Sequence, residues 1–303
     1  MLHGIASRTV VFADGLPADD GGDGVQPCAW DWRPASVSQD PEDAVRLVNF
    51  VQTATDADRT DAIRRFYDAS FTVRLPTESG DRGVTIPFRI NGDDSPAKLR
   101  LLEQKLRGSP ALRHAGDVVC GRPKPAELKL VVEELARRDP AAFAPERTRD
   151  EIRAYLADLG IGIDCSGSVV QALYACRGCD RRRLGLGDLH QGIFAGIDNN
   201  RAFAKIADPS QVRPGDIIIL GAPPDDCYGH KVIVVEKRVA SPVVFISVMS
   251  SWGHEGPAER TWVYDPATES WGDLGGVFTD GTPFTSPASG PWDHPLRGIY
   301  RAR

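Results

Sequence analysis

The sequence predicts an α+β fold, in which a mainly helical N-terminal half precedes a further helix and an antiparallel sheet. Apolar residues recur at helical spacing between residues 41 and 159, and again at 164–176. Strand-sized segments rich in β-branched residues then follow at Asp216–Leu220, Lys231–Glu236 and Val243–Met249. Helices that come first and strands that come afterwards are typical of an α+β protein, because an alternating order would instead indicate parallel βαβ units.

The N-terminal half is expected to hold helices around one strand pair. Residues 1–40 are rich in Gly, Asp and Pro and predict an irregular lead-in with one short strand at Thr9–Phe12. A boundary near residue 140 separates a mainly helical region, 1–140, of unknown role from a second domain, 141–303. The expected helices are 41–54, 58–67, 95–108, 125–138 and 147–159, and the expected strands are 70–76 and 83–91.

The second domain begins with the helix Asp164–Cys176, which carries Cys165 in its first turn. A loop-rich stretch is expected at 177–210, before the three strands. The tail from Trp252 is rich in Gly, Pro and Trp, and it predicts loops and short strands.

The composition is that of a globular protein. The 303 residues are 41% hydrophobic and 26% charged, which is enough for a sizeable core in one large domain or two ordinary ones. The net charge of −6 gives no reason to expect a nucleic-acid partner. The first residues lack the pattern of a secretory signal, and the longest apolar runs are far too short for a membrane span. We therefore expect a chain that is cytoplasmic as synthesised and has no membrane partner.

Cys165 is the candidate nucleophile. A thiol attacks as thiolate, and a helix N-terminus lowers a thiol pKa through its unpaired N–H groups and the positive end of its dipole. The small residues around it, Gly162-Ile-Asp and Ser166-Gly, predict a backbone that lets an acyl group approach. The same N–H groups would hold the oxyanion of a tetrahedral intermediate.

His230 is the candidate base. It opens the apolar strand Gly229–Glu236 and is therefore expected at the rim of the sheet. It also follows the segment Val212–Leu220, in which Pro-Gly-Asp predicts a turn before a buried strand. Each signal alone is weak, but the order of cysteine helix, Pro-Gly-Asp strand and Gly-His strand is informative.

This order resembles the NlpC-type cell-wall peptidases and their CHAP relatives, over about residues 147–255. The resemblance implies a papain-like core of helices packed on an antiparallel sheet, with Cys165 as nucleophile and His230 as base. It also implies hydrolysis of an amide bond in a peptide or isopeptide, such as the stem peptide of peptidoglycan. No cofactor or metal is implied.

The third residue of such a site would orient the imidazole from the next strand. Ser250, at the end of that strand, is the first choice, and His254 and Ser247 are the alternatives. A serine stabilises an imidazolium less than a carboxylate does. The Tyr and Gly pair that many family members carry before the cysteine motif is missing here, so the substrate is not inherited with the motif.

The remaining cysteines give weaker signals. Cys176 and Cys179 form a Cys-x-x-Cys pair, which suits a redox couple or half a zinc site but has no further ligands at a supporting spacing. Cys227 is a rival nucleophile, but it lies in an acidic loop with no helix to lower its pKa.

The sequence thus predicts a cysteine peptidase or amidase. The alternatives are an acyl transferase of the same fold and a binding module that keeps the fold without catalysis. Without a signal peptide, a cell-wall enzyme would need a specialised secretion system. Whether an inhibitor or immunity protein pairs with it is left open by the sequence.

Overall fold

The structure is a computed structural model of the whole chain. It describes residues 55–77, 80–90, 92, 94–177, 184–186, 194, 196–221, 229–252, 256–278, 283–284 and 295–303. The predicted helix 41–54 and the short strand at Thr9–Phe12 lie outside these residues.

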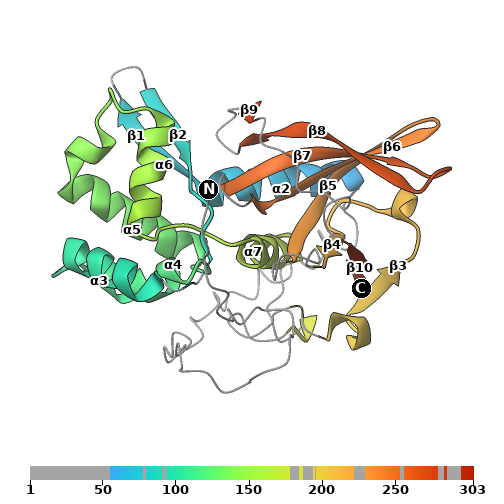
Figure 1. Cartoon of the computed structure of the whole chain (residues 1–303), viewed down its shortest axis with the longest axis horizontal. Coiled ribbons are helices and arrows are strands. Elements are labelled where there is room, and N and C mark those ends of the chain that lie inside the picture. Colours follow the sequence, from blue (N-terminus) through green and yellow to red (C-terminus); the bar gives the residue numbers. More distant parts are fainter. Residues whose placement is uncertain are drawn as a thin grey trace, which may run out of the picture.

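The described part of the chain has the predicted α+β architecture. Its helices and a large antiparallel sheet form separate layers, with a small hairpin beside the helices (Figure 1). The helices are α2 (Asp56–Phe71), α3 (Ser95–Leu106), α4 (Ala115–Val119), α5 (Pro125–Arg138), α6 (Arg149–Asp158) and α7 (Cys165–Arg177). The hairpin is β1 (Thr72–Thr77) and β2 (Gly80–Thr85).

The large sheet has eight strands among the described residues, in the order β3-β10-β4-β5-β6-β7-β8-β9. Every neighbouring pair is antiparallel. The strands are β3 (Phe203–Ile206), β4 (Ile217–Leu220), β5 (His230–Ala240), β6 (Val243–Trp252), β7 (Gly256–Asp265), β8 (Ser270–Phe278), β9 (Pro283–Phe284) and β10 (Leu296–Ala302).

Two parts of the sheet differ from the sequence prediction. The tail after Trp252 forms the long strands β7 and β8 and returns as β10, rather than loops and short strands. The stretch 177–210, expected as loops, contributes the edge strand β3. In both places strand pairing overrides a composition rich in Gly and polar residues, because each segment completes the hydrogen bonds of a neighbour.

Strands β4 to β6 present their residues alternately to two hydrophobic clusters. One cluster lies under α7 and includes Ile219 and Ile233. The other includes Leu220 and Val232, and its members among the described residues come from the sheet and from the turn before β4. We call these the helix-facing side and the inner side of the sheet.

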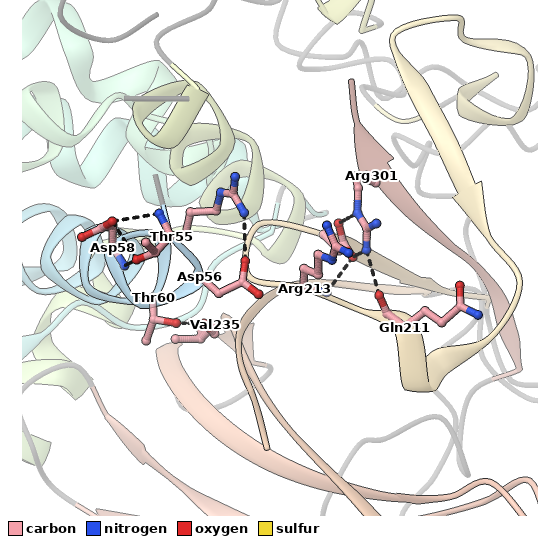
Figure 2. A network of polar contacts seen from close by, with 10 residues as sticks. Thr55, Asp56, Asp58, Thr60, Gln211, Arg213, Val235 and Arg301 are labelled. Atoms are coloured by element: carbon pink, nitrogen blue, oxygen red, sulfur yellow. Dashed lines mark hydrogen bonds and ion pairs between the residues drawn. The ribbon is translucent and has the colours of Figure 1, made fainter. Parts of the chain in front are cut away.

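The helix-facing cluster continues across residue 140. Helix α2 contacts both α7 and β5, and the core includes residues of α2, α3, α5, α6 and α7 together with β4 and β5 (Figure 1). The Thr60 hydroxyl of α2 donates to the Val235 carbonyl of β5 at 2.6 Å (Figure 2). The N-terminal region therefore shares a core with the sheet.

The Pro-Gly-Asp turn before β4 ties that strand to β10. The buried Asp216 carboxylate accepts from Arg301 through Nε at 2.8 Å and Nη2 at 2.7 Å, and from the backbone N–H of Arg213. Arg301 also donates to the Gln211 carbonyl (Figure 2). The turn predicted from the sequence is thus held by an ion pair between two strands.

Candidate functional site

Helix α7 begins where three segments meet. Before it, Ile163 bridges Phe88, which lies beyond the end of β2, and the Ser251 hydroxyl of β6 donates to the Ile163 carbonyl at 2.6 Å. The next backbone N–H, that of Asp164, donates to Gly121 at 2.8 Å. The start of α7 is therefore fixed from the N-terminal region and from the sheet.

The small residues around Cys165 serve this internal packing. A Cβ on Gly162 would lie 2.5 Å from the Pro87 carbonyl, and one on Gly167 would lie 3.1 Å from the Gly121 carbonyl. The contact at Gly162 is too close for a side chain, and the contact at Gly167 is tighter than most that side chains make. In this structure the glycines therefore admit neighbouring backbone, whereas the sequence predicted that they let an acyl group approach.

Asp164 caps α7. Its carboxylate accepts the backbone N–H of Gly167, and its carbonyl accepts that of Ser168, as expected for an N-cap. The other carboxylate oxygen accepts from Arg122 Nε at 2.7 Å. The side chains of Asp164 and Arg122 are 6% and 10% exposed, so this ion pair is buried. Arg122 comes from the segment between α4 and α5 and was not expected at the site.

Cys165 is the first residue of α7, and the residue is 9% exposed. Burial and the negative charge of Asp164 raise its pKa to about 12. Three groups act in the opposite direction: the backbone N–H of Lys231 and the Ser166 side chain, which hydrogen-bond to the sulfur, and the charge of Arg122. The predicted acidification by the helix N-terminus is thus outweighed by burial.

His230 is the first residue of β5, as the sequence predicted, but its ring lies on the inner side of the sheet. It pairs with Leu220 of β4, an inner-side residue, and its ring stands 4.3 Å from that of Trp252, measured between centroids. Helix α7 packs on the other side. The structure therefore brings β5 to the Cys165 sulfur without turning the His230 ring to the same face.

Lys231, which was not predicted to be a site residue, occupies the helix-facing position next to His230 in β5. It pairs with Ile219, a residue of the helix-facing cluster, and it is 3% exposed. Burial lowers its pKa to about 7, and the positive charge of Arg297 acts in the same direction. The sequence does show a lysine directly after the candidate histidine. Lysines are rarely buried, however, so the sequence alone predicts that this side chain is exposed.

Ser250 lies on the inner side, the same side as His230, and is fully buried. Its hydroxyl donates to the Lys231 carbonyl at 2.5 Å. The alternative Ser247 shares a 3.2 Å hydrogen bond with Thr261 of β7. His254, the other alternative, lies outside the described residues. The assignment of the third residue stays a prediction.

The other cysteine predictions fall mainly on parts of the chain that the structure does not describe. These are Cys179, Cys227 and the side chain of Cys176. Within the described residues, no three His, Cys, Asp or Glu side chains come together as a metal site would require.

No model of a protein family matches the chain, and neither do the curated proteins or the solved structures that were compared with it. Within the described ranges, no helix has the length and apolar character needed to cross a bilayer.

Proposed function

We propose that this protein is a cysteine-dependent amide hydrolase with a papain-like core, and that Cys165 is its nucleophile. The observation that carries the proposal is the position of the thiol. It is the first residue of a buried helix packed on an antiparallel sheet, and its sulfur accepts a backbone N–H from the strand beneath. The helix that carries Cys165, the strand after Pro-Gly-Asp and the strand that begins at His230 follow one another along the chain in the order on which the resemblance rests.

In the proposed reaction a base takes the thiol proton, and the thiolate attacks the amide carbonyl carbon. Backbone N–H groups at the start of α7, including that of Cys165, stabilise the oxyanion. The C–N bond breaks as the leaving nitrogen receives the proton from the base. Water then hydrolyses the thioester, which releases a carboxylic acid and restores the thiol.

Strand β5 supplies the base in this proposal. The resemblance assigns the role to His230, whose ring lies against Trp252 in this structure. Lys231 already shares that side with α7, and a pKa of about 7 makes it partly neutral at physiological pH. The geometry therefore adds a second candidate base.

The proposed substrate is a peptide like the stem peptide of peptidoglycan. Purified sacculi are incubated with the protein, and released fragments are identified by mass spectrometry. We expect new amino and carboxyl ends with the wild type, and a loss of at least about a thousandfold with Cys165→Ala, because no other group replaces the nucleophile. Cys120→Ala, at a buried cysteine outside α7, is the matched control and should keep activity.

Fragment release that survives in Cys165→Ala would refute the role of the thiol. An amine acceptor added to the same reaction separates hydrolysis from acyl transfer, because transfer yields an amide of the acceptor in place of a free acid.

A second candidate, a binding module that keeps the fold without catalysis, is favoured by the pKa values. Burial raises the pKa of Cys165 and lowers that of Lys231, and both shifts oppose transfer of the thiol proton to the lysine. Unchanged binding to sacculi by Cys165→Ala, with no fragments released by the wild type, would support this candidate.

A further inference from the structure

The buried ion pair between Arg122 and Asp164 lies next to the candidate nucleophile. It joins the segment between α4 and α5 to the cap of α7, and Cys165 follows directly in the chain. The pair belongs to no part of the reaction described above. Its surroundings indicate what it does.

The segment around Arg122 is built to approach α7 closely. Gly121 has a φ of +75°, and a Cβ there would lie 2.1 Å from the Arg89 carbonyl, so glycine is required. The carbonyl of this glycine accepts the Asp164 backbone N–H, and the Arg122 side chain passes over the first turn of α7 at Gly167. The segment between α4 and α5 thus binds the backbone N–H of Asp164 through the Gly121 carbonyl and its carboxylate through the Arg122 side chain.

Asp164 is also the ion-pair partner that the structure shows for the Arg122 guanidinium. The Nη1 atom of Arg122 is buried and makes no hydrogen bond with the described residues, while Nε is bonded to the carboxylate. The carboxylate and the guanidinium act on the thiol with opposite sign, since the first disfavours a thiolate and the second favours it.

We propose that Arg122 is a positioning residue for Cys165, which neutralises the Asp164 cap and thereby makes the reactivity of the thiol depend on the N-terminal region. The inference deepens the proposed function and rests on it. It gives residues 1–140 a role at the nucleophile, through one side chain between α4 and α5.

Other charged or titratable groups also face the start of α7. Strand β5 brings Lys231 to the helix-facing side, while His230 lies against Trp252 on the inner side. Helix α2, which contacts α7, carries the buried Tyr67. Strand β6 contributes the uncharged Ser251. Arg122 and Asp164 are the pair that can be changed without altering these groups.

The test is the rate at which iodoacetamide alkylates Cys165 in the full-length protein, measured by peptide mapping from pH 7 to 9.5. Arg122→Gln should slow alkylation about tenfold at each pH, which corresponds to one unit in the thiol pKa. Asp164→Asn should speed it by a similar factor, because it removes the negative charge while asparagine still caps the helix. The double variant should return near the wild-type rate, and Arg122→Lys should stay close to it.

The opposite signs separate this role from a merely structural one. Both single variants break the same buried ion pair, so a structural role predicts that both loosen α7 and both speed alkylation. Arg153→Gln is the matched control, since Arg153 has a side chain of the same 10% exposure and an ion pair with Asp150 on α6. It should leave the rate unchanged.

Changes in the same direction for Arg122→Gln and Asp164→Asn would overturn the inference. This outcome is distinguishable from failure of the proposed function, because alkylation reports the thiol directly and needs no substrate.

Discussion

The two sides of strand β5 place neighbouring residues in different surroundings. On the helix-facing side, Lys231 lies under α7, whose first residue is Cys165. On the inner side, His230 lies against Trp252 in a cluster that also contains Trp262 and Tyr264. One step along the strand therefore decides which ionisable side chain shares a face with the thiol.

Burial has a different consequence on each side of the strand. The helix-facing side holds groups whose pKa values burial displaces, Cys165 upwards and Lys231 downwards. The inner side holds aromatic rings in edge contacts, such as Trp252 with Trp262 at 6.1 Å, and the Arg260 guanidinium lies 5.1 Å over the Trp252 ring. The first side therefore holds ionisable groups with displaced pKa values, and the second holds packed aromatic rings.

Removing each candidate base in turn should have the largest effect. Lys231→Met is expected to lower the hydrolysis rate about 10²- to 10⁴-fold, because it removes the proton acceptor on the side of the thiol. His230→Ala should lower it less than about tenfold. Fragment release from sacculi measures both. The reverse order would identify His230 as the base.

Truncation of the inner cluster should affect stability and spare the thiol. Trp262→Ala is expected to lower the free energy of unfolding by about 3–5 kcal/mol, since a fully buried indole leaves a large cavity. Urea unfolding measures the loss, and Cys165 alkylation under native conditions should stay within about twofold. If the variant does not fold, Trp262→Phe provides the smaller step. An equally large effect on alkylation would show that the two sides are not independent.

The pH dependence of the free energy of unfolding should reveal the contribution of Lys231. Its folded pKa of about 7 lies below its ordinary value of 10.5, so between these values the unfolded state binds the proton that the folded state lacks. Stability is therefore gained as the pH rises through this window and lost as it falls. From pH 7 to 9 the contribution is about 2–3 kcal/mol.

The Cys165 thiol affects the free energy of unfolding at higher pH, and its effect has the opposite sign to that of Lys231. Because the folded pKa of Cys165 is raised from 9.0 to about 12, stability falls as the pH rises above 9. Urea unfolding at pH 7, 8 and 9 therefore isolates Lys231, and Lys231→Met should flatten the rise. A variant as steep as the wild type would mean that the lysine is charged when folded.

Local sequence patterns predicted several elements well. The helices α5 and α6 agree with the expected ranges to within two residues, because their amphipathic spacing and their capping residues point to the same limits. The tail after Trp252 was predicted poorly. Its strands β7 and β8 contain Gly and charged residues, and they are strands because β6 offers them hydrogen-bond partners.

At the candidate site, local sequence patterns were enough to predict that Cys165 lies in the first turn of a helix and that His230 opens a buried strand. Asp164 is a residue type that commonly caps a helix, and the segment after it has helical spacing. Gly229–Glu236 contains a short apolar run that is typical of a buried strand. Only the tertiary structure decided which of its residues face α7. The run Val232–Val235 is apolar without alternation, so it can be buried with either face toward the helix, and only the register with β4 and β6 settles the choice. The Arg122–Asp164 pair was equally hidden, because its partners lie 42 residues apart in the chain and meet only when two separate segments pack together.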